Sequence, residues 1–248
     1  MRNYKMIIAY DGSRYKGWQR QNLTNLTIQT ILERTVEQVV GYPVEIDGSG
    51  RTDAGVHAKA QVANLKVTGL LAEDFVKELN DLLPEDICVR EMKLVPGNFH
   101  SRYSVKAKKY KYCIDMREKP CVFTRRYTYH FTKKLDLDAM KKAVQYLKGT
   151  HDFTAFTDNK EEKSKVRTIY EIKITKNGTR LELEFYGTGF LYHMVRILTG
   201  TLLEVGCGEK SPEEVKLALE QKDRAFAGFL VPARGLFLEK VYYQEGEA

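Results

Sequence analysis

Little in this sequence points to disulfide bonds, a structural metal or a membrane. Its 248 residues include only four cysteines, which form neither a Cys-x-x-Cys pair nor a Cys/His cluster with zinc-ligand spacing: Cys88, Cys113, Cys121 and Cys207. No apolar run is long enough to cross a bilayer, and the first residues lack the pattern of a signal peptide. We therefore expect a reduced, cytoplasmic protein without a metal.

The chain also has fewer acidic than basic residues. The chain has 33 Asp and Glu against 40 Lys and Arg, which gives a formal net charge of +7 at pH 7. A positive field favours a polyanionic partner, and nucleic acid is a better candidate than an anionic membrane. With 43% hydrophobic residues, the chain can form one large domain or two smaller halves, each with its own core.

The first half alternates between strand-like and helix-like patterns. In chain order we predict a strand at 4–10, a helix at 28–39, strands at 44–49 and 61–67, a helix at 71–82 and a strand at 87–94. This order is β-α-β-β-α-β.

The second half repeats much of that order. We predict a strand at 109–115, a helix at 137–147, a hairpin of strands 168–176 and 180–186, a helix at about 192–205, a helix beginning at 211–214 and a strand at 235–243. Asp136 is suited to cap the first of these helices, Ser211 and Glu214 to form a capping box, and Asn177-Gly178 to make the hairpin turn.

The repeated order predicts an α+β protein of two tandem ferredoxin-like, or RRM-like, halves with mainly antiparallel sheets. We place the division between an N-terminal half at 1–105 and a C-terminal half at 106–248.

A glycine-rich loop at 48–58 holds the most distinctive side chains. Asp53 lies between Arg51 and His57 in a run of small residues, where glycine permits tight turns and the close approach of a partner. The loop therefore has the composition of a catalytic turn. An ordinary surface turn with a solvated aspartate is the alternative.

Basic and aromatic residues alternate in three segments, 14–21, 106–112 and 163–167. Lysine and arginine bind phosphates, and flat rings stack on unpaired bases. In the second segment, strand alternation would place Tyr110 and Tyr112 on one face. Buried sheet tyrosines with solvated lysines are equally compatible with this pattern. The charges of the third segment are equally compatible with plain solvation. In the first segment, we expect Trp18 to be a core residue.

A third cluster lies at 187–196, where a glycine-rich loop enters an apolar helix. His193 and Arg196 are three residues apart and so share one helix face. A cation on an apolar helix needs a partner, and we predict an ion pair between Arg196 and Asp53. We expect His193 to be a hydrogen-bonded structural residue.

The loop at 48–58 resembles the catalytic motif of the A-type tRNA pseudouridine synthases. Further segments agree in order along nearly the whole chain: 16–21, 98–102, 108–112, 151–156, 189–196 and 232–236. The resemblance implies the pseudouridine synthase fold with a central cleft between the halves, a homodimer, and no cofactor or metal. It also implies that the protein isomerises uridine to pseudouridine in the anticodon stem-loop of tRNA, at roughly positions 38 to 40.

The resemblance further identifies Asp53 as the catalytic aspartate, Tyr110 as the active-site tyrosine, Arg196 as the active-site arginine and Arg51 as the arginine of the motif. Asp53 could attack C1′, attack the base or remove a ribose proton, and the sequence leaves these routes open. We also predict a set of substrate-binding residues: Tyr110, Arg14, Lys16, Arg20, His57, Lys108, Lys109 and Leu236.

Two other functions are alternatives to this one. A non-catalytic RNA-binding protein would leave the aspartate in the glycine loop unexplained. A hydrolytic glycosidase would need a second carboxylic acid opposite Asp53, and Asp152 or Asp158 could supply one.

Overall fold

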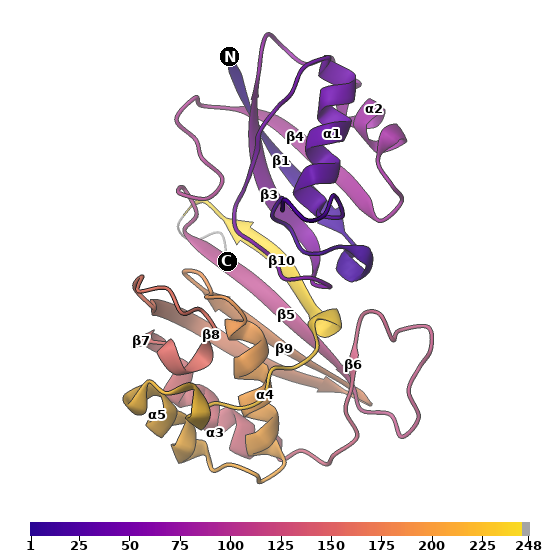
Figure 1. Ribbon diagram of the computed structural model, residues 1–248. Helices are drawn as coiled ribbons and strands as arrows, with labels where there is room; N and C mark the ends of the chain where they lie inside the picture. Colours follow the sequence, from indigo (N-terminus) through magenta and orange to yellow (C-terminus); the bar gives the residue numbers. More distant parts are fainter. Residues whose placement is uncertain (245–248) are drawn as a thin grey trace. The chain divides into compact units, whose positions relative to one another are not determined.

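Alternating apolar residues along the first strand, β1 (Arg2–Tyr10), place Met6, Ile8 and Tyr10 in the core. The computed structural model describes residues 1–244, and in it β1 pairs antiparallel with both β3 (His57–Val67) and β4 (Ile87–Val95). The short β2 (Ile46–Gly48) pairs antiparallel with the other edge of β3. The resulting order β4-β1-β3-β2 is that of a ferredoxin-like sheet. Figure 1 shows β1, β3 and β4 side by side.

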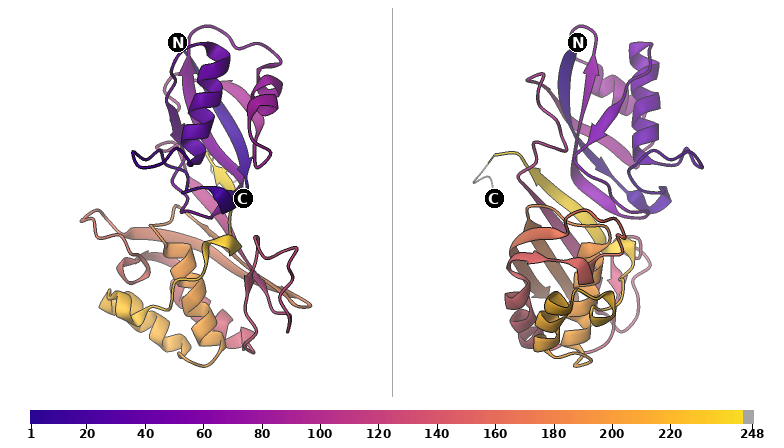
Figure 2. Two further views of the ribbon diagram at one scale, coloured as in Figure 1. Left: turned by 45° about the vertical axis from the view of Figure 1, so that its right-hand side comes forward. Right: turned by 60° about the vertical axis from the view of Figure 1, so that its left-hand side comes forward.

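Two helices cover one face of this sheet (Figure 2). α1 (Ile28–Val40) buries Ile28, Leu32 and Val36 at helical spacing, and α2 (Phe75–Leu82) buries Phe75 and Leu79. The predicted β-α-β-β-α-β order of the first half is therefore confirmed. The helix predicted from residue 71 begins at Phe75, and the strand predicted from residue 61 begins at His57.

The strands of the second half also pair mainly antiparallel. β9 (Arg180–Gly187) pairs with β5 (Ala107–Asp115) and with β8 (Val166–Asn177), and β8 pairs in turn with β7 (Gly149–Asp152). The two-residue β6 (Tyr129–His130) runs parallel to β5. We did not predict β6 and β7, because strands this short carry too few alternating residues for a pattern.

This half has three helices, α3 (Leu137–Leu147), α4 (Met194–Gly206) and α5 (Pro212–Gln221). α3 and α4 contact the strands β8 and β5, respectively, and α5 packs against α3. Asp136 caps α3 by accepting from the N–H groups of residues 138 and 139, and Ser211 and Glu214 form the predicted capping box of α5. α4 is almost entirely buried, and α3 packs against it. The fold class is therefore α+β, as predicted.

The chain divides into two units, Met1–Lys106 together with the chain from Phe237 onward, and Ala107–Leu236. The last strand, β10 (Leu236–Tyr242), joins the first unit because Phe237 and Leu238 pair with His57 and Ala58 of β3. The sequence had suggested that this strand belongs with the C-terminal half. A pairing between strands as far apart in the sequence as β3 and β10 leaves no local pattern from which it could be predicted.

Candidate active site

Asp53 lies in the loop between β2 and β3, and hydrogen bonds fix the backbone on both sides of it. The carbonyl of Thr52 accepts from the N–H of Trp18 at 3.1 Å, and the Thr52 hydroxyl bonds to that of Tyr10 at 2.8 Å. The carbonyl of Asp53 accepts from the N–H of Val56 at 3.1 Å. The side chain of Asp53 is therefore presented, partly exposed, from a backbone that has little freedom to move.

Two glycines permit this close packing. A Cβ on Gly48 would lie 2.4 Å from the indole nitrogen of Trp18, and a Cβ on Gly12 would lie 1.9 Å from the carbonyl oxygen of Val56. Any side chain at either position would displace the loop. Trp18 is fully buried, which confirms its predicted role in the core.

The polar side chain of Gln61 on β3 holds the beginning of the loop. Buried Gln61 accepts from the Ser49 hydroxyl at 2.6 Å and donates to the carbonyl of Gly50 at 3.0 Å. We did not assign Gln61 a role from the sequence. A glutamine among apolar residues of a strand was the available signal, because a buried amide needs partners.

The position of His57 corrects its predicted role. Its side chain is only 1% exposed, it accepts from the N–H of Gly12 at 3.1 Å, and its ring stacks on Phe237 at 4.7 Å. A buried imidazole cannot contact RNA directly, so we assign His57 to holding the end of the Asp53 loop against β10.

Arg51 is exposed, and its Nε donates to the Oε1 of Gln19 at 3.2 Å. Gln19 belongs to the segment that contains Trp18 and packs against the Asp53 loop. Gln19, which lies outside the motif, therefore orients the side chain of Arg51.

The predicted phosphate-binding residues of the first unit include two with carboxylate partners. Arg14 lies 2.9 Å from Asp86, and Arg20 lies 2.9 Å from Glu33. Tyr15 also donates to Asp86, and burial followed by this bond raises the pKa of Tyr15 to about 12. Both guanidinium groups remain largely exposed, so a phosphate can approach them but must share them with these acids. Lys16 is exposed on the same loop.

In the second unit, Tyr110 and Tyr112 face the core side of β5, as the alternation predicted. Tyr110 is 8% exposed and meets Phe190 edge-on at 5.3 Å. On the other side of the strand, Lys109 lies 3.0 Å from Glu184 of β9. Burial alone would raise the pKa of Glu184, but Lys109 and Lys111 lower it, so this carboxylate is ionised and neutralises its lysine neighbours. Lys108 is partly exposed.

Arg196 extends from the first turns of α4. Its Nε donates to the carbonyl of Val231 at 2.8 Å, and the Tyr112 hydroxyl donates to the carbonyl of Pro232 at 2.7 Å. The segment that ends at Leu236 is thus attached to both α4 and β5. Leu236 itself is only 5% exposed, so this placement supports a packing role more than the predicted contact with substrate.

His193 is bonded to Asp158, as expected for a structural histidine, with 2.6 Å between Nδ1 and Oδ2. Arg224 donates to the other oxygen of Asp158 at 3.1 Å. Burial would raise the pKa of Asp158, but His193 and Arg224 lower it below its usual value. The pKa of Asp152 is also lowered, because bonds from Thr154 and Lys222 outweigh the effect of burial. A general acid needs a raised pKa, so neither aspartate suits the general-acid role in the hydrolase alternative.

Two features are absent from residues 1–244. Within this range no group of three or more His, Cys, Asp or Glu side chains is arranged to hold a metal ion. None of the helices described there is both long enough and apolar enough to span a membrane.

Comparison with known proteins gives consistent matches. A family model described as tRNA pseudouridine synthase matches residues 6–104 and 143–244. The chain is 50% identical to a tRNA pseudouridine synthase A of Bacillus sp. (strain KSM-64), 47% to one of Clostridium kluyveri and 42% to one of Acetivibrio thermocellus. Each alignment covers 98% of this chain and 100% of the relative. A solved Cbf5-Nop10-Gar1 complex matches with a TM-score of 0.40 at 9% identity, over 97% of this chain and 50% of that one, which is too distant to support an argument.

Proposed function

Because the chain belongs to the tRNA pseudouridine synthase A family, whose members convert uridine to pseudouridine in the anticodon stem-loop of tRNA, we propose that Asp53 is its catalytic residue. The observation that carries this proposal is the Asp53 loop, which is immobilised on both sides while its carboxylate stays accessible. The activity is that of an isomerase.

The reaction needs no redox carrier and no activated group. The bond between C1′ and N1 breaks, the base turns while it remains bound, C1′ joins C5, and the proton on C5 leaves as N1 gains one. A carboxylate can take part as a nucleophile or as a base. The uridine must also leave its stack to reach Asp53, and an unpaired loop nucleotide leaves most easily.

Three further residues complete the proposed chemistry. We propose that Tyr110, which is 8% exposed in the free protein, stacks on the uracil after its ring becomes more accessible. We also propose that Arg196 supplies positive charge for the Asp53 carboxylate and that Arg51 contacts the nucleotide that enters. Arginine suits these tasks because its guanidinium is always charged and donates in a fixed geometry. The ion pair between Asp53 and Arg196 remains a prediction.

The setting of the activity is also proposed. We propose that the protein modifies uridines around positions 38 to 40, acts as a homodimer and is cytoplasmic. These proposals rest on the family resemblance and on the composition of the chain. The proposed phosphate contacts are exposed or partly exposed, which supports this role: Lys16, Arg14, Arg20, Lys108 and Lys109. Lys109 should contribute least among them, because Glu184 lies 3.0 Å away and neutralises it.

The decisive experiment uses unmodified tRNA labelled with tritium at C5 of uridine. We expect the wild-type protein to release tritium and to leave pseudouridine in the RNA. Asp53→Asn should release none while its affinity for tRNA stays within about twofold, because the amide keeps the size of the side chain but neither attacks nor accepts a proton. The matched control is Asp81→Asn, an exposed aspartate on α2.

The products distinguish the alternatives. Free uracil together with abasic RNA would indicate a hydrolase, and tight RNA binding without either product would indicate a binding protein. Substantial turnover by the Asp53→Asn variant would rule out Asp53 as the catalytic residue.

A further inference from the structure

A surface turn at 99–104 presents an exposed tyrosine from a rigid base. Tyr103 is 77% exposed, and Arg102 beside it is exposed as well. Exposed aromatic rings are common on mobile loops, where they need no explanation. This turn is different because buried polar groups fix its backbone.

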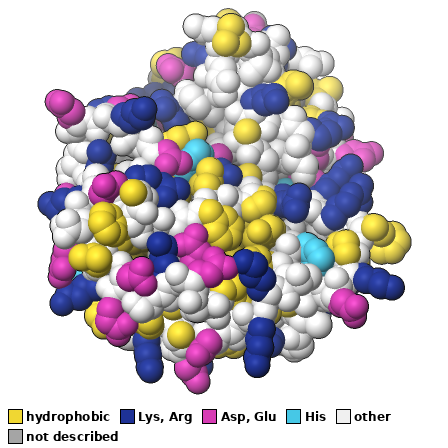
Figure 3. Space-filling model, turned by 60° about the horizontal axis from the view of Figure 1, so that its bottom comes forward, with side chains coloured by type: hydrophobic (Ala, Val, Ile, Leu, Met, Phe, Trp, Pro, Cys, Tyr) yellow, Lys and Arg dark blue, Asp and Glu magenta, His cyan; other side chains and the backbone are white. Residues whose placement is uncertain are grey.

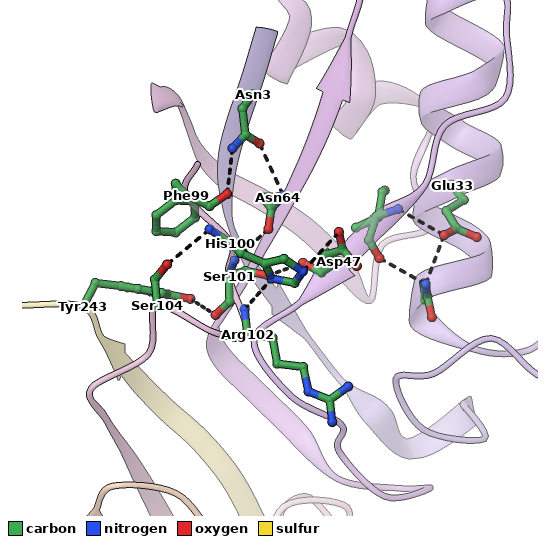
Figure 4. Close-up of polar contacts among 12 residues, drawn as sticks. Asn3, Glu33, Asp47, Asn64, Phe99, His100, Ser101, Arg102, Ser104 and Tyr243 are labelled. Carbon is green, nitrogen blue, oxygen red and sulfur yellow. Dashed lines mark hydrogen bonds and ion pairs between the residues drawn. The ribbon is translucent and has the colours of Figure 1, made fainter. Parts of the chain in front are cut away.

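Ser101 is the centre of that attachment (Figure 4). It is fully buried, its N–H donates to Asn64 of β3 at 2.7 Å, and its carbonyl accepts from the Tyr243 hydroxyl at 2.7 Å. Asn64 also donates to Asn3 of β1, which donates in turn to the carbonyl of Phe99 at 2.8 Å. The strands β1 and β3 and the side chain of Tyr243 therefore hold this one turn.

The same serine connects the turn to the Asp53 loop. The Ser101 hydroxyl donates to the carbonyl of Asp47, which directly precedes Gly48 and belongs to β2. His100, also on the turn, has its Nε2 3.8 Å from the carboxylate of Asp47. Because these contacts lie within the first unit, the turn and the beginning of the Asp53 loop are fixed to each other.

The groups around Tyr103 are polar and basic. Its ring centroid lies 4.3 Å from that of His100, and the guanidinium carbon of Arg102 lies 6.0 Å from the centre of the ring. A protein interface is usually built around several apolar anchors. A single exposed ring beside a guanidinium is instead the combination that holds single-stranded nucleic acid, the ring by stacking on a base and the cation by its charge. A net charge of +7 is consistent with such a ligand.

We propose that Tyr103 and Arg102 form an RNA-binding site outside the active site, in which Tyr103 stacks on an unpaired nucleotide of the substrate tRNA and Arg102 binds a neighbouring phosphate. This inference rests on the proposed function, since it takes tRNA as the ligand. The contact orients the anticodon arm relative to the Asp53 loop, because the turn at 99–104 and the Asp53 loop are both anchored at Asp47.

The test compares Tyr103→Ala, Tyr103→Phe and Arg102→Gln in tRNA binding by fluorescence anisotropy and in turnover. Loss of one stacked base weakens binding about tenfold or more, so Tyr103→Ala should raise Kd and KM by about that factor with little change in kcat. Tyr103→Phe keeps the stacking surface and should bind within about twofold of wild type. Because both side chains are exposed, the melting temperatures should not change.

Salt titration separates the two contributions. Arg102→Gln should lower the slope of log Kd against log salt concentration by about 1, since one phosphate contact is lost. Tyr103→Ala should leave that slope unchanged. Lys77→Gln is the control for charge, because Lys77 is an exposed cation of the same unit on α2, paired with Asp81.

The outcomes separate this inference from the proposed function. Wild-type affinity for tRNA in both Tyr103→Ala and Arg102→Gln would overturn the RNA contact, even if the protein makes pseudouridine. A changed molecular mass in solution with unchanged tRNA affinity would also overturn it, because it would make the turn a protein interface. Weakened tRNA binding in Tyr103→Ala together with normal binding in Tyr103→Phe would support the contact, even if the wild type showed no isomerase activity.

Discussion

At the scale of single residues, Arg196 depends on main-chain geometry for its position. Its Nε donates to the carbonyl of Val231, so the guanidinium is oriented before any substrate binds. A positioned cation contributes most when charge develops in a water-excluded site. We expect Arg196→Ala to lower kcat about 100-fold or more.

Arg196→Lys tests whether charge alone is enough. Lysine keeps the charge but lacks the fixed donor geometry, so this variant should recover only a small part of the lost rate. Single-turnover kinetics with labelled tRNA measures the effect, and thermal unfolding shows whether α4 still packs. Turnover within about threefold of wild type in Arg196→Ala would remove this residue from the proposed active site.

Asp158 gives a prediction about pH. Its folded pKa lies below the ordinary value of about 3.9, so its interactions with His193 and Arg224 stabilise the folded state above that value and are lost as the pH falls through the folded pKa. Asp158→Asn should lower the melting temperature near pH 6, by the equivalent of about 1 kcal/mol or less because the carboxylate is partly exposed. The difference from wild type should shrink steadily toward pH 3. A difference that stays constant over this range would show that these interactions do not depend on ionisation.

At the scale of elements, the Asp53 loop depends on close packing between two turns. Gly48→Ala would place a methyl group 2.4 Å from the indole nitrogen of Trp18, so the loop or the tryptophan must move. Such overpacking costs about 1–3 kcal/mol. We expect a lower melting temperature and a larger loss of kcat than of tRNA affinity.

Gly97→Ala is the matched control for this substitution. A Cβ at Gly97 would meet nothing within 4 Å, and the residue does not need a positive φ. Its stability and turnover should match wild type. If Gly48→Ala were equally neutral, the tight contact between Trp18 and the loop would have no importance for catalysis.

Elements with strong local signals could be predicted from the sequence, and those fixed by distant contacts could not. Asp136 and Ser211 cap α3 and α5 because capping depends only on neighbouring residues. Asp53 could be proposed as the catalytic residue from the small residues around it and from the family resemblance. The roles of Gln61 and Ser101 depend on partners that are far away in the sequence, and no spacing rule reveals these.

At the scale of the whole molecule, the number of Lys and Arg residues overstates how many cations are available to bind RNA. Many cations have carboxylate partners, among them Lys109 with Glu184 and Arg20 with Glu33. Seen from below Figure 1, the surface carries Lys and Arg side chains interspersed with Asp and Glu (Figure 3). The sequence alone gives the sum of the charges, but only the structure shows which of them are paired.

This pairing predicts unequal effects for two lysines that the sequence placed in the same class. Lys16 is exposed on the segment that packs against the Asp53 loop, whereas Lys109 lies 3.0 Å from Glu184. Lys16→Gln should lower the slope of log Kd against log salt concentration by about 1, because a phosphate contact releases a counterion. Lys109→Gln should change that slope by much less, since Glu184 already neutralises the lysine. Equal slopes for the two variants in tRNA-binding titrations would mean that RNA displaces Glu184 from Lys109, and that pairing in the free protein does not decide which cations bind the substrate.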